Sequence, residues 1–183
     1  MCRITNLTPT HVYGQPISSI YHATDVARIT VLQKWGGIYL DSDVLILKCL
    51  DPFRNYEMVV GWPKNEYIGT QILLACKHAR FLAAWLEGYR RYNPRNWYYN
   101  AGQYPTEQIL AKLPHLAHRV PELFGVHNWL HELYETNNWT DWKRYYAIHL
   151  LSRHRPAPFY VNETLLEQMN NTFSQIANYI LNS

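Results

Sequence analysis

The sequence predicts a single α/β domain. Its 183 residues are 48% hydrophobic and 15% aromatic, which is enough apolar material for one well-formed core. Apolar stretches with the spacing of strands alternate along the chain with stretches that have the spacing of helices, an order typical of α/β architecture. The sequence has no internal repeat, no low-complexity tract and no linker rich in glycine and serine. One domain over residues 1–183 therefore fits better than two.

Composition argues against several classes of protein. Seven tryptophans, 15 tyrosines and a formal net charge of only +3 are untypical of a disordered chain. The small basic excess is spread along the sequence, so charge gives no reason to expect a nucleic-acid partner. No apolar run approaches the roughly 18 to 20 residues of a membrane helix, and the first residues lack the apolar core of a signal peptide.

The first third of the chain predicts a helix, a tight turn and two short strands. Residues 24–35 carry apolar side chains at helical spacing, with Thr24 as the expected cap. The pair Gly36 and Gly37 supplies the stop, because glycine tolerates the backbone conformations of a sharp turn. Two apolar runs follow and predict buried strands: residues 38–40 and residues 44–47.

The remainder of the chain predicts further strands and helices around an aromatic loop. The expected strands are residues 56–62 and 71–76. The expected helices are residues 81–92, residues 106–113 and a closing helix at about 163–181, which presents one apolar face to the body. Residues 94–104 predict an aromatic loop, and residues 123–142 have no pattern that assigns them.

Two carboxylates one residue apart, Asp41 and Asp43, follow the predicted strand at residues 38–40. In open α/β sheets ligands gather beyond the carboxyl ends of strands, so both side chains are expected to face a binding crevice. Hard oxygen donors at this spacing suit Mn²⁺ or Mg²⁺, which take further ligands from substrate phosphates. Such an ion would stabilise a leaving diphosphate. Taken alone, a motif of this kind favours a solvated turn, and the sequence around it reverses that interpretation.

A longer pattern surrounds this motif. Residues 23–28 are Ala-Thr-Asp-Val-Ala-Arg, and residues 34–44 are Lys-Trp-Gly-Gly-Ile-Tyr-Leu-Asp-Ser-Asp-Val. Together they closely resemble the DXD-containing sugar-binding region of one glycosyltransferase family. That family includes the α-1,4-galactosyltransferases and α-1,4-N-acetylglucosaminyltransferases of animals and the initiating α-1,6-mannosyltransferases of fungi. The resemblance implies a GT-A-like fold, which is a Rossmann-like mixed sheet with flanking helices.

The resemblance also implies a nucleotide-sugar donor, a divalent cation and transfer with retention of anomeric configuration. Asp41 and Asp43 would form the catalytic centre, where Asp41 contacts the ribose or sugar of the donor and Asp43 the metal. Asp25 and Arg28 match the family's helix motif and are expected at the donor site. Their spacing also allows a salt bridge within the helix, and both interpretations can hold together.

Further candidates follow from looser parts of the same resemblance. The remaining expected donor-site residues are Gly37, Tyr39, Gln71, Asn100 and Gly102. Gln71 is the weaker candidate among them, because the asparagine that the family commonly has ahead of this strand is absent. Residues 146–149, Tyr-Ala-Ile-His, resemble the segment whose histidine completes the metal site in related enzymes. His149 is therefore either a third metal ligand, together with Asp41 and Asp43, or a structural histidine with hydrogen bonds.

Other side chains admit more than one interpretation. Trp97, Tyr98 and Tyr99 either line an acceptor site, where aromatic faces stack on sugar rings, or pack in the core. His127 and His131 have the spacing of a zinc-binding helix. Asn at position 128 stands where a metalloprotease of that type has glutamate, which argues against that class.

The resemblance also bears on organisation and location. In the resembled family a membrane anchor, a stem and the first strands precede the helix motif, whereas only 24 residues precede Asp25 here. We therefore expect the first strands to be absent, in a fragment or a shortened relative, with membrane attachment only through an anchor outside this chain. Four Asn-X-Ser/Thr sequons favour the secretory pathway, and the family resides in the Golgi lumen. The sequons begin at Asn6, Asn138, Asn162 and Asn170.

These expectations combine into one function. The protein would move a hexose from a nucleotide sugar, with a UDP-sugar favoured, to a hydroxyl of a glycan or glycolipid, with Mn²⁺ or Mg²⁺ as cofactor. The alternative is a truncated, inactive homologue that acts as a glycan-binding or partner-binding module.

Overall fold

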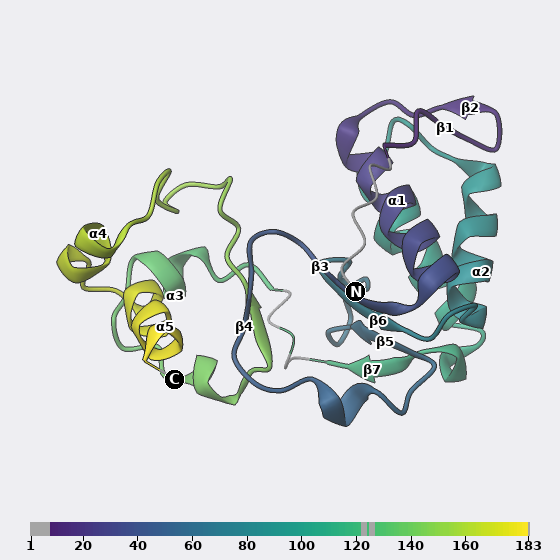
Figure 1. Cartoon of the computed structure of the whole chain (residues 1–183). Helices are drawn as coiled ribbons and strands as arrows, with labels where there is room; N and C mark the ends of the chain where they lie inside the picture. The colour runs from purple at the N-terminus through teal and green to yellow at the C-terminus, as the bar shows by residue number, and fades with distance from the viewer. Residues whose placement is uncertain (1–7, 122–123, 125–126, 183) are drawn as a thin grey trace.

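A computed structural model of the chain describes residues 8–121, 124 and 127–182, and it has two lobes. Figure 1 shows the larger lobe, a small sheet under two helices, beside a smaller lobe of short helices near the C-terminus. A pair of strands lies between the lobes. These are β4 (Val44–Ile46) and β8 (Ala147–His149), which pair antiparallel with Val44 opposite His149. The fold thus brings residues 41–43 next to a segment about a hundred positions later.

The larger lobe is organised on a four-stranded mixed sheet with the order β3-β6-β5-β7. Strands β3 and β5 both pair antiparallel with β6, and β5 pairs parallel with β7. The helices lie against the sheet, so the predicted α/β class with a mixed sheet and flanking helices is confirmed. The strands are β3 (Gly37–Leu40), β5 (Met58–Gly61), β6 (Ile72–Ala75) and β7 (His118–Val120). A hairpin of β1 (His11–Val12) and β2 (Gln15–Pro16) precedes them.

Helix α1 (Ile20–Trp35) connects that hairpin to β3. The Ser19 side chain caps the helix by accepting a hydrogen bond from the backbone N–H of His22. The expected start at Thr24 was wrong, because Ser19 caps the helix one turn earlier, where Ile20 and Tyr21 are exposed and do not extend the apolar pattern. The Thr24 hydroxyl donates to the carbonyl of Ile20. Gly36 ends the helix at φ +67°, and a Cβ there would lie 2.6 Å from the backbone nitrogen of Lys77.

Alternate residues of the central strands enter two different cores. Val60 and Leu73 face α1 and α2 (Arg80–Gly88), where the buried helix residues include Ile29 and Trp85. Val59 and Leu74 face the other side and pack with Phe53, Phe124 and Ala147. Both faces of the central strands β5 and β6 are thus covered. The prediction of a buried strand at residues 38–40 was wrong in this respect: β3 is an edge strand that exposes Ile38 and Leu40, and only Tyr39 packs against the core.

The smaller lobe has a third core, formed mainly by aromatic side chains and by α3 (Leu130–Tyr134) and α5 (Thr172–Leu181). In place of the single closing helix expected over residues 163–181, two helices form: α4 (Glu163–Gln168) and α5. Met169 has extended backbone angles, and Asn171 makes a capping box with Ser174 that starts α5 afresh. The apolar side chains would fit one continuous helix, but the cap formed by Asn171 divides the segment into two.

Two other predicted segments have a different local structure. The expected helix over residues 81–92 is divided into α2 and a 3₁₀ turn at Tyr89–Arg91. The expected aromatic loop at residues 94–104 contains a π-helical turn at Tyr99–Gln103, which continues into another at Pro105–Leu110. Across the described residues, no helix combines the length and the apolar character needed to cross a membrane.

Candidate functional site

A polar cleft of about 740 Å³ opens between the lobes at the carboxyl end of β3. Residues of α1, of the loop after β3 and of the loop after β8 line it. The cleft lining includes Tyr21, Asp25, Arg28, Tyr39, Asp41, Asp43, Thr70, Gln71, Trp97, Tyr98, His149, Ser152 and Arg153. All four carboxylate and imidazole groups that the sequence analysis names for the site meet here with Arg28.

Arg28 is the buried centre of the cleft, with 7% of its surface exposed. Its Nη2 lies 3.3 Å from Asp25 Oδ1, and its Nη1 lies 3.3 Å from Asp41 Oδ1. The same Nη1 donates to the carbonyl oxygen of Thr70 at 2.6 Å. The guanidinium also lies over the ring of Tyr39, 4.6 Å from its centroid. The helical salt bridge with Asp25 is therefore present, and Arg28 lines the cleft as well.

The Asp25 carboxyl is buried beside this arginine. Burial raises the pKa of Asp25 to about 6; the positive charge of Arg28 opposes the shift, and the negative charge of Asp41 adds to it. Asp25 thus titrates near neutral pH, so its charge in the cleft depends on pH.

Asp41 is fixed by its neighbours on the sheet. The hydroxyl of Tyr39 donates to Asp41 Oδ1 at 2.7 Å, and the backbone N–H of Asp41 donates to the carbonyl of Gln71 at 2.9 Å. Burial is the largest cause that raises the pKa of the Tyr39 hydroxyl, so it stays protonated as a donor. Tyr39 and Arg28 therefore orient one oxygen of Asp41 and leave its other oxygen for the cleft.

Asp43 is bound from the smaller lobe. Its Oδ1 lies 3.2 Å from His149 Nε2, and its Oδ2 accepts hydrogen bonds from the backbone nitrogen and the hydroxyl of Ser152, each at 3.0 Å. Burial works against ionisation of Asp43, but His149 and Ser152 outweigh it and lower the pKa of the carboxyl. Burial lowers the pKa of His149, although Asp43 opposes the shift. The pair is thus an anionic carboxylate beside a neutral imidazole at neutral pH.

Asp41, Asp43 and His149 are close enough to hold one divalent ion. One ligand atom from each lies within 4.8 Å of the other two. His149 is 8% exposed, and Ser152 fixes the carboxylate beside it. Two carboxylates and a neutral imidazole are suitable ligands for a divalent metal, so the donor set fits the ion that the motif predicts.

Two expected donor-site residues, Asn100 and Gly102, lie behind the cleft and do not line it. Asn100 Oδ1 accepts from the backbone nitrogen of Asn93, and its carbonyl oxygen accepts from Trp85 Nε1, each at 2.8 Å. The ring of Tyr98 covers Gly102 so closely that a Cβ there would lie 2.0 Å from Tyr98 Cε1. Because Tyr98 lines the cleft, Gly102 shapes its wall through that ring.

The other two candidates differ from one another. Gln71 lines the cleft and also an adjacent pocket of about 620 Å³, and its buried Oε1 has no hydrogen-bond partner among the described residues. Gly37 has φ +110° and is exposed, and it does not line the cleft. Its role is in the backbone turn between α1 and β3.

The aromatic candidates separate in the same way. Trp97 and Tyr98 line the cleft, whereas Tyr99 packs edge-on against Tyr104 with 6.0 Å between ring centroids. His127 and His131 do not converge: each pairs with a different glutamate, at 3.2 and 2.8 Å. The arrangement therefore gives no support to a zinc helix.

Sequence reasoning did not find Tyr21, Ser152 or Arg153. Ser152 and Arg153 follow His149 by only a few positions, and that proximity is the one signal that could have pointed to them. Tyr21 packs edge-on against Trp97, with 4.8 Å between ring centroids. Ser152 and Arg153 reach the cleft because β8 pairs with β4, a long-range contact that no local pattern predicts, whereas Tyr21 reaches it from the first turn of α1.

Comparison with known proteins agrees with this geometry. Residues 3–60 match the family described as glycosyltransferase sugar-binding region containing DXD motif. The chain is also similar in sequence to several glycosyltransferases. The matched segment contains Asp25, Arg28, Asp41 and Asp43, and the resemblance seen in the sequence is thereby confirmed.

Three curated relatives illustrate the similarity. Glucan organizing enzyme 1 of Cryptococcus neoformans is 26% identical over 60% of this chain, and inositol phosphoceramide mannosyltransferase 3 of Schizosaccharomyces pombe is 29% identical over 69%. Human lactosylceramide 4-alpha-galactosyltransferase is 28% identical over 67%. The chain spans 35%, 40% and 35% of the length of these relatives. The solved structure of the PaToxG glycosyltransferase aligns with 50% of this chain and 35% of its own, at 22% identity and a TM-score of 0.37.

Proposed function

We propose that this protein is a metal-dependent, retaining glycosyltransferase that moves a hexose from a nucleotide sugar, with a UDP-sugar favoured, to a hydroxyl of a glycan or glycolipid. The observation that carries the proposal is the convergence of Asp41, Asp43 and His149 beside Arg28 in one cleft. Retention, and a GT-A type of fold around the donor, are what the family resemblance adds.

The charges of the cleft support a metal-dependent donor site. Three carboxylates, from Asp25, Asp41 and Asp43, face two guanidinium groups, from Arg28 and Arg153. Near neutral pH this set is negative, so a diphosphate that enters alone would be repelled. A divalent cation reverses the sign, and when bound it would neutralise charge on the leaving diphosphate. We therefore expect nucleotide binding to require the ion.

The donor set favours Mn²⁺ as that cation. Asp41 and Asp43 supply oxygen and His149 supplies nitrogen, whereas Mg²⁺ prefers oxygen ligands throughout. Burial favours the neutral form of His149, in which one ring nitrogen has a free lone pair for a metal ion. Ser152 orients Asp43, and Tyr39 with Arg28 orients Asp41, so the ligands need little rearrangement.

The acceptor is proposed to be a glycolipid or glycan hydroxyl. The names of two relatives state that they act on ceramide lipids, inositol phosphoceramide and lactosylceramide. Tyr21 and Trp97 are 41% and 57% exposed at the cleft, and exposed aromatic faces of this kind stack on sugar rings. They are the expected acceptor wall.

The proposed location is the Golgi lumen, with any membrane attachment through a segment outside this chain. The sequons at Asn138, Asn162 and Asn170 lie in the smaller lobe with exposed asparagines, which is compatible with luminal glycosylation. The sequon at Asn6 lies outside the described residues. Expression in a secretory host, followed by a shift in mass on removal of N-glycans, tests this location.

The proposed function is tested by titrating the chain with UDP and with GDP, each with and without Mn²⁺, in a calorimeter. One nucleotide should bind, and only with Mn²⁺ present. Asp43→Asn should weaken that binding at least about tenfold, because it removes a charged ligand. Asp51→Asn is the matched control, since Asp51 forms an exposed ion pair with Arg54.

Two results would contradict the proposal. One is equal nucleotide binding with and without Mn²⁺. The other is a folded wild-type chain that binds neither nucleotide, which would favour the alternative of a glycan-binding or partner-binding module.

A further inference from the structure

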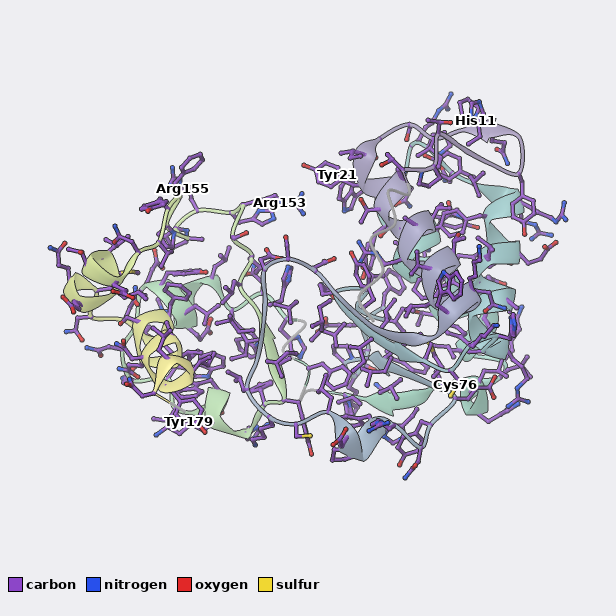
Figure 2. The ribbon with its side chains drawn as sticks, viewed as in Figure 1. His11, Tyr21, Cys76, Arg153, Arg155 and Tyr179 are labelled. Carbon is purple, nitrogen blue, oxygen red and sulfur yellow. The ribbon has the colours of Figure 1, made fainter. Side chains whose placement is uncertain are left out.

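Arg153 reaches the cleft from the smaller lobe, directly after the serine that holds Asp43. It is exposed, and its guanidinium carbon lies 4.7 Å from the ring centroid of Tyr21 on α1. Figure 2 shows the labelled Tyr21 and Arg153 side chains pointing toward one another across the gap between the lobes. The arginine therefore stands at the mouth of the cleft that contains Asp41, Asp43 and His149.

The two arginines of the cleft differ in what they contact. Arg28 is buried, and its N–H groups are directed at Asp25, Asp41 and the Thr70 carbonyl. Arg153 has no carboxylate partner among the described residues, and it contacts the face of an aromatic ring. Stacking uses the flat face of a guanidinium and leaves the N–H donors on its edge available.

A free guanidinium edge beside a candidate metal cluster is suited to one class of ligand. Phosphate oxygens accept two parallel N–H bonds from arginine, and a diphosphate bound to a metal ion presents such oxygens to its surroundings. Ser152 ties the backbone next to Arg153 to Asp43 through two hydrogen bonds of 3.0 Å. The arginine is thus tethered close to where the ion would be held.

We propose that Arg153 binds the diphosphate group of the nucleotide-sugar donor, and that Tyr21 orients its guanidinium for this contact. The inference rests on the proposed function, because it needs a nucleoside diphosphate in the cleft. In this arrangement the larger lobe supplies the carboxylates for the cation, and the smaller lobe supplies the arginine for the phosphates. A donor would then contact both lobes at once.

The test compares Arg153→Gln and Arg153→Lys with the wild-type chain in two titrations. The first measures the affinity for Mn²⁺ alone by electron paramagnetic resonance, and the second the affinity for UDP with Mn²⁺ saturating. Arg153→Gln should weaken UDP binding about tenfold or more and leave the Mn²⁺ affinity within about twofold. The UDP affinity of Arg153→Lys should lie between those of the wild type and Arg153→Gln, since lysine keeps the positive charge but cannot donate two parallel hydrogen bonds.

Arg155→Gln is the matched control. Arg155 is also an exposed arginine of this loop, it donates to the carbonyl of Ala157, and it does not line the cleft. Its variant should bind both Mn²⁺ and UDP like the wild type.

The outcomes separate this inference from the proposed function. If the wild type binds UDP with Mn²⁺ and Arg153→Gln binds it equally well, the inference is overturned and the proposed function stands. Loss of Mn²⁺ affinity in Arg153→Gln would also overturn it, because the residue would then act by holding the Asp43 loop. If the wild type binds neither UDP nor GDP in the presence of Mn²⁺, both proposals fail.

Discussion

The two lobes differ in their secondary structure and in the side chains that form their cores. The larger lobe has a four-stranded sheet whose central strands are covered on both faces, a helix of 16 residues and a core that includes many aliphatic side chains. The smaller lobe has helices of 5, 6 and 10 residues and packs aromatic rings, such as Trp129, Trp139 and Tyr145, against one another. Its strand β8 pairs with β4, which follows directly from the candidate motif.

The difference shows how the site is assembled. The rigid lobe presents Asp41 and Asp43, and the smaller lobe brings His149, Ser152 and Arg153 to them. A site of this kind can lose its function without global unfolding, because undocking of the smaller lobe removes half of its groups. Substitutions in one lobe, or at the contacts between the lobes, should therefore have different effects.

The largest effect is expected in the rigid lobe, at Arg28. Arg28→Met leaves the buried Asp25 carboxylate and the half-buried Asp41 carboxylate without their cation, which should lower the free energy of unfolding by about 3 to 5 kcal/mol. Urea denaturation at pH 7 measures it. Adding Asp25→Asn in the same chain should recover part of the loss. A loss below about 1 kcal/mol in the single variant would mean that the ion pairs contribute little.

A smaller side chain in the core of the smaller lobe should make that lobe unfold more readily than the larger lobe. Ile176 is fully buried, so Ile176→Ala should cost about 2 to 4 kcal/mol. Hydrogen exchange should accelerate in α3, α5 and β8 while β5 and β6 keep their protection, and the affinity for Mn²⁺ should fall. Asn178→Ala, at an exposed position of the same helix, is the control. Equal acceleration in β5 and β6 would show that the lobes unfold as one unit.

The pH dependence of stability should reveal the buried Asp25. Its pKa is raised from 3.8 in the unfolded chain to about 6 in the folded one, so the folded state binds the proton more tightly. Stability should therefore fall as the pH rises from about 4 to 6, by up to about 3 kcal/mol in unfolding free energy. Asp25→Asn should lack this decrease. The same slope in wild type and variant would assign the effect to another group.

The smallest effect is expected at Tyr39. Tyr39→Phe removes the 2.7 Å hydrogen bond to Asp41 Oδ1 and should lower the free energy of unfolding by about 1 to 2 kcal/mol. Thermal denaturation measures the change. Tyr56→Phe is the control, because Tyr56 is 43% exposed and stacks on His118 through its ring. Equal effects of the two variants would show that the Asp41 contact does not stabilise the fold.

Local patterns in the sequence predicted the elements of the rigid lobe well. Apolar periodicity placed the body of α1 and the strands β3 to β6, because each packs apolar side chains against a core, although β3 leaves Ile38 and Leu40 exposed. The helix starts were less predictable, since single side chains set them: Ser19 caps α1, and Asn171 starts α5. Such caps compete with other polar residues nearby that look equally suitable.

The site was predictable only in part. Residues 41–43 are adjacent in sequence and resemble a known motif, and the same resemblance named His149. Ser152 and Arg153 have no local pattern, because they reach the cleft through the pairing of β4 with β8. Asn100 and Gly102 were expected at the donor, but neither lines the cleft. Gly102 lies behind the ring of Tyr98, and the carbonyl of Asn100 accepts a hydrogen bond from Trp85. The spacing of residues along the chain does not show which of them a neighbouring ring separates from the cleft.

The central claim is that Asp41, Asp43 and His149 hold one divalent ion across the seam between the lobes. The most direct measurement is anomalous diffraction at the manganese edge from crystals grown with Mn²⁺ and UDP. We predict one strong peak in the cleft, within coordination distance of Asp43 and His149, with the diphosphate against it. Bound nucleotide without a manganese peak between these side chains, or a peak elsewhere, would contradict the claim.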